Sequence, residues 1–140
     1  MIKESLNNSF KQQFDLEAQV FAKSPGKINI IGEHTDYNNG FVLQAAIDKY
    51  IYVAIAERAD QEIHLFSSDY NEYYTTTLSN TDTTATPEWA KYILGASQII
   101  NQKTNNIKGF NLYLAGDVPL GAGLSSSAAL SSAVGYALNE

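Results

Sequence analysis

Gly121-Ala-Gly-Leu-Ser-Ser-Ser-Ala-Ala129 sets two glycines and three serines in front of a run of small residues that begins a helix. Gly121 and Gly123 can adopt positive φ and let the backbone approach a ligand closely. The first turn of the expected helix offers free N–H groups and a partial positive charge, and the serine hydroxyls add further donors. This pattern predicts a phosphate-binding loop. An ordinary turn before a Ser- and Ala-rich helix explains the same spacing equally well.

The loop differs from two other phosphate-binding motifs. No Gly-Lys-Ser/Thr follows its glycines, as a P-loop requires, and the third glycine of a dinucleotide-binding fingerprint is absent. A different phosphate-binding architecture is therefore expected if the loop binds phosphate.

The composition is that of an acidic globular protein. Of the 140 residues, 44% are hydrophobic and 17% are charged, and the net charge is −6. A nucleic-acid-binding protein would normally show a basic patch, and the sequence has none. The absence of cysteine excludes disulfides and cysteine-ligated metals. The N-terminus does not resemble a signal peptide, and no apolar run approaches the roughly 18 residues of a membrane span. We therefore expect a cytoplasmic protein without a membrane partner.

Periodicity predicts an α+β domain in which helices pack on an antiparallel or mixed sheet. Leu6, Phe10 and Phe14 repeat every four residues, which indicates an amphipathic helix over residues 3–16. Thr86-Pro87-Glu88 begins a second helix, and a third follows the serine loop. Alternating or β-branched runs predict strands at residues 20–22, 28–31, 41–43, 50–57, 63–66, 73–78 and 109–116. No linker or repeat interrupts residues 1–140, so we expect one domain.

The second helix is expected to bury a single apolar face. Its members are Trp89, Tyr92, Ile93, Ala96, Ile99 and Ile100. His64 lies in an alternating strand and is given no role.

A second polar cluster lies in Pro25-Gly-Lys-Ile-Asn-Ile-Ile-Gly-Glu-His-Thr-Asp-Tyr-Asn-Asn-Gly40. Lys27 precedes an expected strand, and Glu33, His34 and Asp36 follow that strand in a polar loop. Carboxylates accept hydrogen bonds from paired sugar hydroxyls, and an imidazole can donate or accept. The same three side chains could bind a divalent metal if the loop brought them together. A solvated polar turn is the third interpretation, and the residue types alone leave all three open.

The two clusters together resemble one family. Residues 25–43 resemble the signature of the galactokinases, and Pro119-Leu-Gly-Ala-Gly-Leu-Ser-Ser-Ser-Ala-Ala129 resembles the ATP-binding motif of the wider GHMP small-molecule kinase family. Gly32-Glu-His-Thr-Asp-Tyr37 points to galactokinases rather than to mevalonate or homoserine kinases. The resemblance implies the N-terminal domain of a GHMP kinase over residues 1–140, and ATP-dependent phosphorylation of galactose at its anomeric hydroxyl.

The resemblance also implies roles for individual residues. Lys27 is expected to stabilise the charge of the transition state, in a position where galactokinases usually have arginine. Lysine keeps the charge but lacks the planar, bidentate guanidinium. Galactose is expected to be bound by Glu33, His34, Thr35 and Asp36. ATP is expected to be bound by Ser67, Trp89, Gly121, Ala122, Gly123, Leu124, Ser125, Ser126 and Ser127, with Ser127 also holding Mg²⁺.

Other parts of the family pattern fall outside this sequence. The resemblance places the catalytic aspartate, a second magnesium carboxylate and the C-terminal domain beyond Glu140. We therefore expect the isolated chain to be inactive and the full-length protein to be a monomer that binds galactose and ATP. An N-acetylgalactosamine kinase, a non-catalytic sugar and ATP sensor, and an inactive fragment are the alternatives.

Overall fold

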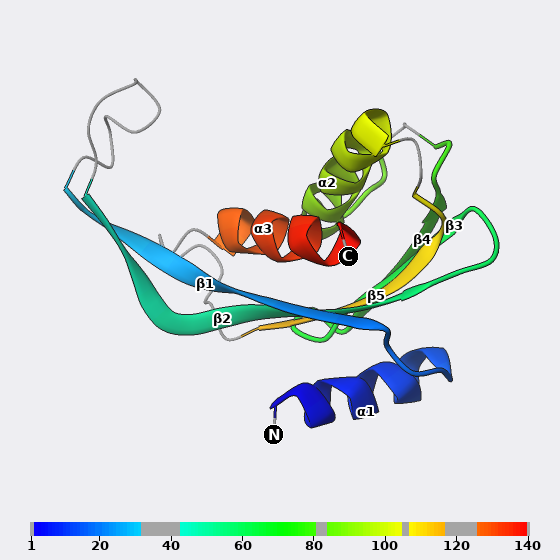
Figure 1. Ribbon diagram of the computed structural model, residues 1–140, viewed down its shortest axis with the longest axis horizontal. Helices are drawn as coiled ribbons and strands as arrows, with labels where there is room; N and C mark the ends of the chain where they lie inside the picture. Colours follow the sequence, from blue (N-terminus) through cyan, green and yellow to red (C-terminus); the bar gives the residue numbers. More distant parts are fainter. Residues whose placement is uncertain (1, 32–42, 81–83, 105–106, 117–125, 140) are drawn as a thin grey trace.

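The computed structural model describes residues 2–31, 43–80, 84–104, 107–116 and 126–139. Within these ranges the chain forms a mixed sheet with α1 on one face and with α2 and α3 on the other (Figure 1). The elements are α1 (Ile2–Phe14), β1 (Val20–Ile31), β2 (Leu43–Glu57), β3 (Glu62–Ser67), β4 (Glu72–Thr77), α2 (Glu88–Thr104), β5 (Phe110–Gly116) and α3 (Ser126–Leu138). The expected α+β class with a mixed sheet is confirmed.

The strand order decides which loops come together. The order is β1-β2-β5-β3-β4, and β3 and β5 are parallel while the other neighbours are antiparallel. Because β1 and β5 are both antiparallel to β2, β1, β5 and β3 run in the same direction. Their carboxyl ends therefore point to the same end of the sheet, which we call the carboxyl edge: Ser67 and Gly116 lie close to one row, and Ile31 lies seven residues further out along β1.

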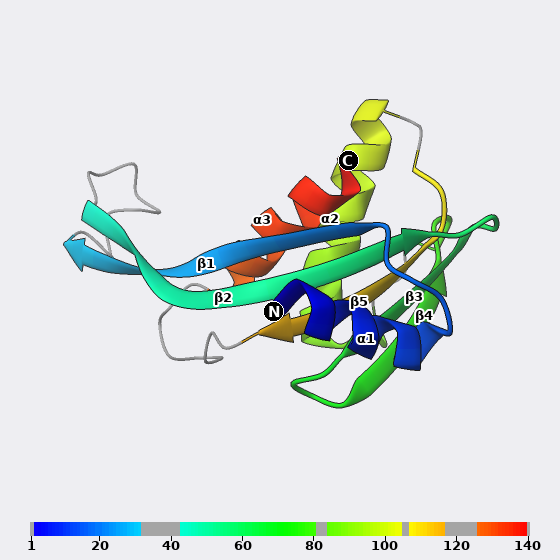
Figure 2. The ribbon, with the colours of Figure 1, turned by 60° about the horizontal axis from the view of Figure 1, so that its bottom comes forward.

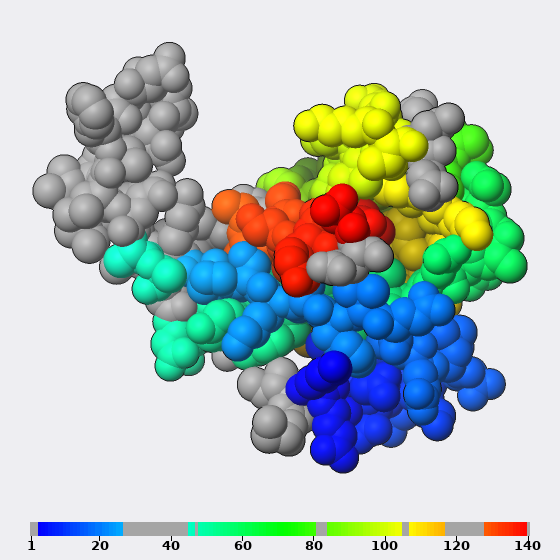
Figure 3. Space-filling model, viewed as in Figure 1, coloured from blue at the N-terminus to red at the C-terminus, as the bar shows by residue number. Residues whose placement is uncertain are grey.

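The main core lies between the sheet and the two helices α2 and α3. Buried and more exposed side chains alternate strictly along β3, so that Ile63 and Leu65 face this core. α2 and α3 bury Ile93 and Val134 in the same core. Each such fully buried aliphatic side chain contributes about 1.5–3 kcal/mol relative to exposure. The residues of α3 visible in Figure 3, in red and orange, lie between α2 and β1.

The opposite face of the sheet is covered by α1. Leu6 and Phe10 are buried against Ala54 and Ala56 of β2, and Phe14 packs on Tyr73 with ring centroids 5.9 Å apart. Figure 2 shows α1 lying across this face. The four-residue spacing that predicted the helix is the spacing of the side chains that it buries.

The hairpin of β1 and β2 is longer than predicted. The sequence predicts that Ser24-Pro25-Gly26 separates two strands, but β1 continues through it to Ile31, with a register shift between Pro25 and Lys27. Proline lacks a ladder donor, and β1 tolerates it because it is the outermost strand. The turn signal is therefore absorbed as an irregularity inside one strand.

The predicted apolar face of α2 was partly wrong. Tyr92 and Ile99 are 42% and 57% exposed. The buried side comprises Trp89, Ala90, Ile93, Leu94 and Ser97. The helix is rotated so that small residues, which the hydrophobic pattern underrates, lie in the close contact with the sheet and α3.

None of the helices in the described ranges is long and apolar enough to cross a membrane.

Candidate functional site

The predicted site residues divide into described and undescribed groups. Glu33, His34, Thr35 and Asp36 and residues 121–125 lie outside the described residues, so their roles stay predictions. For Lys27, Ser126 and Ser127 the structure gives the backbone position, and for Ser67 and Trp89 it also gives the side chain.

The carboxyl edge brings the two predicted motifs to one side of the sheet. Residues 32–42 follow β1 directly, and residues 117–125 follow β5 directly. Ile51 of β2 pairs with Ser24 of β1 on one side and with Gly116 of β5 on the other. Both segments thus begin beyond this row, residue 117 directly after it and residue 32 after seven further residues of β1. Ligands of sheets with parallel strands commonly bind outside such carboxyl ends.

Lys27 lies beyond the row in which β5 ends. It pairs with Ala46 of β2, three residues further along β1 than Ser24. α3 packs over β1 and β2, so the helix that follows residues 117–125 lies on the strand that carries Lys27. The strand that carries Lys27 and the helix that follows residues 117–125 are therefore packed together, although they are far apart in sequence.

The start of α3 is electrostatically suited to an anion. The helix begins at Ser126, and its first turn has no acidic residue. The unpaired N–H groups and the dipole of a helix N-terminus favour negative charge, by roughly 0.3–1 kcal/mol at an exposed site. The first turns of α1 and α2, by contrast, each contain a glutamate, Glu4 and Glu88.

Ser67 and Trp89 lie in the corner formed by β3, β4 and α2. Ser67 is fully buried, and its hydroxyl accepts the backbone N–H of Tyr70 at 3.4 Å. Trp89 is 6% exposed, and its indole N–H donates to the carboxylate of Glu72, which lies opposite Ser67 in the ladder. The expectation that Trp89 belongs to the core is confirmed, while the role of both residues in nucleotide binding stays a prediction.

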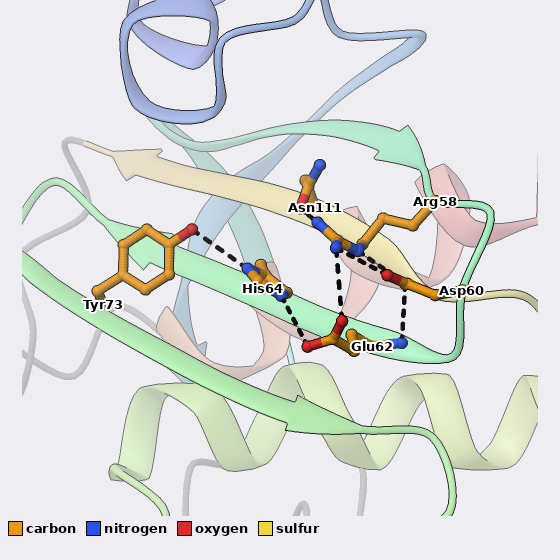
Figure 4. A network of polar contacts seen from close by, with 6 residues as sticks. All are labelled: Arg58, Asp60, Glu62, His64, Tyr73 and Asn111. Atoms are coloured by element: carbon orange, nitrogen blue, oxygen red, sulfur yellow. Dashed lines mark hydrogen bonds and ion pairs between the residues drawn. The ribbon is translucent and has the colours of Figure 1, made fainter.

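A separate group of polar side chains, the polar cluster under α1, lies on the sheet face that α1 covers (Figure 4). The guanidinium of Arg58 forms two bonds of 2.9 Å to Asp60 and donates to the Asn111 side chain, also at 2.9 Å. His64 lies 3.4 Å from both Glu62 and the Tyr73 hydroxyl. Sequence reasoning missed this cluster because its members come from four elements, and nothing in their spacing signals the contacts.

The charges of this cluster stabilise one another. The hydrogen bonds from Arg58 hold the pKa of the Asp60 carboxyl well below its usual range, and the same bonds raise the pKa of Arg58. Burial raises the pKa of the Tyr73 hydroxyl. The cluster ties the β2–β3 turn to β5, which indicates a structural role at a distance from the carboxyl edge.

A cleft of about 330 Å³ lies at the opposite edge of the sheet, where β1 begins and β2 ends. Val20, Ile55, Ile107 and Leu138 line it, and its charged groups, Glu57 and Lys108, pair with each other at 3.1 Å. The charges of its two charged described lining residues therefore offset each other.

The described residues contain no group of three His, Cys, Asp or Glu side chains that could hold a metal. Ser127, in the first turn of α3, is a hard oxygen donor of the kind that Mg²⁺ accepts alongside phosphate oxygens and water. The donor chemistry at this position thus fits magnesium.

Family models match two parts of the chain. Residues 8–57 match the galactokinase galactose-binding signature, and residues 91–140 match the GHMP kinases N terminal domain. The first match spans the β1–β2 hairpin, and the second spans α2, β5 and α3, so both motifs of the carboxyl edge are included.

Solved structures extend these matches over the whole chain. Lactococcus lactis galactokinase, complexed with galactose, is 30% identical with a TM-score of 0.84, and the match covers 100% of this chain and 37% of that one. Methanococcus jannaschii mevalonate kinase is 24% identical with a TM-score of 0.76, covering 87% of this chain and 40% of that one, and supports the fold alone. The chain spans less than half the length of either structure. The chain thus matches the galactokinase galactose-binding signature and the GHMP kinase N-terminal domain, and it has a GHMP kinase N-terminal-like fold.

Proposed function

We propose that the protein to which this chain belongs transfers the γ-phosphoryl group of ATP to the anomeric hydroxyl of galactose. The observation that carries the proposal is the carboxyl edge, at which β1 and β5 end directly before the two motifs. The galactose in the Lactococcus lactis structure supports the choice of sugar. One motif would then hold the sugar and the other the triphosphate, on one side of one sheet.

The chemistry asked of these residues is positioning and neutralisation of charge. Phosphoryl transfer proceeds through a loose transition state that spreads charge over the transferred oxygens. In the proposal, residues 121–125 and the start of α3 hold the phosphates by backbone N–H groups. Lys27 offsets negative charge near the attacking oxygen, and Glu33 and Asp36 accept hydrogen bonds from sugar hydroxyls.

Magnesium fits the same arrangement. Ser127 would hold the ion together with oxygens of ATP, as Mg²⁺ sites commonly combine one or two protein ligands with phosphate. When bound, the ion neutralises charge on the phosphates. We further propose that the base which takes the proton of the sugar hydroxyl lies outside these 140 residues, so that the chain alone binds ligands without turnover.

The test is an acceptor comparison with the full-length protein. ADP release is measured with galactose, N-acetylgalactosamine, glucose and mevalonate. Galactose should give the highest kcat/KM. A preference for N-acetylgalactosamine would replace the galactose assignment, and turnover of mevalonate alone would refute a sugar kinase. ADP release from the 140-residue chain would refute the proposed place of the base.

Asp36→Ala provides the test of the sugar site. Removing an acceptor from a bound sugar hydroxyl costs about 1–3 kcal/mol, which is roughly a 5- to 150-fold fall in kcat/KM for galactose. Glu17→Ala is the matched control, since its carboxylate is 69% exposed on the far side of the sheet. Unchanged kinetics in Asp36→Ala would remove Asp36 from the site.

A further inference from the structure

The β1–β2 hairpin contains an irregularity beside Lys27. Over the step from Pro25 to Lys27, β1 advances by the single residue Gly26, while β2 advances by residues 47–49. β2 therefore carries two residues more than its partner, and we call residues 47–49 the β2 bulge. A further register shift follows between Asn29 and Ile31.

A bulge bends its strand and increases the local twist. Figures 1 and 2 both show β2 turning sharply near its start, so that the outer end of the hairpin leaves the plane of the sheet. In Figure 1 this end rises on the side of the sheet where α2 and α3 lie. A hairpin with an even ladder would extend the sheet and leave its end away from α3.

The residues beyond the bend are those with an expected role in transfer. Lys27 is the first residue of β1 past the bulge, and β1 then runs to Ile31, from which the chain enters residues 32–42. α3, which follows the predicted phosphate-binding loop, packs on β1. The bend thus sets the side of the sheet on which the end of β1 lies, and this is the side of α3 (Figure 1).

We propose that the β2 bulge is a positioning device that turns Lys27 and the end of β1 to the face of the sheet on which α3 packs. This rests on the proposed function, because its effect on activity is to bring the sugar to the phosphoryl group. The device is the backbone length of β2, and the side chains of Asp48 and Lys49, which are exposed, serve no part in it.

Deletion of Asp48 and Lys49 tests the proposal. The deletion leaves one residue of β2 opposite Gly26. Because an even number of residues is removed, all remaining side chains of β2 stay on the same face of the sheet as before. The matched control, Asp48→Ala with Lys49→Ala, removes the side chains but keeps the bulge. A second variant inserts two alanines beside Gly26, so that both strands have the same number of residues between the flanking pairs while β2 keeps its length. This variant keeps the test decisive if the deletion variant fails to fold.

Two readouts are compared. In the full-length protein, the deletion should lower kcat/KM for galactose by about 10²-fold, the cost of a misplacement of about 1 Å, while KM for ATP stays within about twofold. In the 140-residue chain, which has no cysteine, spin labels at Ala46→Cys and Ser132→Cys report the distance between the hairpin and α3. This distance should change in the deletion and insertion variants and stay unchanged in the double-alanine control.

The outcomes separate the two proposals. An unchanged label distance in the deletion and insertion variants would overturn the bulge as a positioning device, whatever the activity. A double-alanine control that loses galactose activity as strongly as the deletion would assign the effect to side chains and overturn it as well. Failure of the wild-type protein to phosphorylate galactose would refute the proposed function, and the label distances would still decide the inference.

Discussion

Among the glycines at positions 95, 109, 116 and 135, Gly109 is the one at which an added methyl group should be most destabilising. It immediately precedes β5, and its N–H donates to the backbone carbonyl of Asp60 at 3.0 Å, while its carbonyl accepts from the backbone N–H of Arg58 at 2.8 Å. A Cβ at this position would lie 2.3 Å from the carbonyl oxygen of Glu62 and 2.6 Å from that of Asp60. Both contacts are with backbone, so no side chain can rotate away. Gly109→Ala therefore forces β5 and the β2–β3 turn apart.

The expected magnitude follows from the two effects together. Overpacking costs about 1–3 kcal/mol, and weakening the two backbone hydrogen bonds costs about 0.5–1.5 kcal/mol each, which gives about 2–6 kcal/mol. For a chain of this size the loss corresponds to a fall in Tm of roughly 10 °C. It is a large fraction of the roughly 5–15 kcal/mol that stabilises a typical domain.

Two other glycines provide matched controls with the opposite sign. At Gly95 in α2 and Gly135 in α3, a Cβ would have no neighbouring atom within 4 Å. Glycine inside a helix is less favourable than alanine by about 0.5–1 kcal/mol, because it loses more backbone entropy on folding. Gly95→Ala and Gly135→Ala should therefore raise Tm by a few degrees.

The three variants are compared by urea and thermal unfolding, followed by far-UV circular dichroism and by the fluorescence of Trp89, the single tryptophan. The reasoning is refuted if Gly109→Ala keeps the wild-type Tm, or if either helix variant is destabilised as much as Gly109→Ala. Either result would mean that the backbone contacts around Gly109 are not those described.

Two further predictions concern the polar cluster under α1. Arg58→Met should cost about 1–3 kcal/mol in urea unfolding, because it leaves the side-chain oxygen of Asn111, which is 2% exposed, without its donor; Lys108→Met, which breaks a surface pair, should cost about 0–1 kcal/mol. The pKa of Asp60 is depressed in the folded chain, so its contribution to stability is complete above its ordinary value of 3.8 and is lost as the pH falls toward the folded value. The free energy of unfolding of the wild type should accordingly be larger than that of Asp60→Asn at neutral pH, and the two values should converge in acid. If the two proteins differed by the same amount at both pH values, the link between Asp60 and Arg58 would be contradicted.

Much of the local structure could be predicted from the sequence. The spacing of Leu6, Phe10 and Phe14 is itself the pattern by which α1 buries a face, and the alternation in β3 is the pattern by which a strand does so. The two motifs could also be recognised, because a phosphate loop and a sugar-binding signature depend on residues close together in the chain. Their order and chemistry led to the same family as the comparisons.

Local patterns were misleading where tertiary contacts outweigh them. Pro25-Gly26 has the composition of a turn, but pairing with β2 on one side carries β1 through it, opposite the β2 bulge. Tyr92 and Ile99 fit a helical apolar stripe, yet α2 buries Ala90 and Ser97 because the sheet and α3 lie close to that side. In each case the partner is distant in sequence, so its effect cannot be read from the residues around it.

The sequence by itself determined the class of fold, the helices and most strands, and the two motifs, because these depend on propensity and short-range spacing. The tertiary structure alone decided that β1, β5 and β3 end at one edge, that a bulge bends the hairpin beside Lys27, and that Arg58 reaches Asn111 across the sheet. These features depend on strand order and register, which are settled by the joint burial of side chains from distant segments.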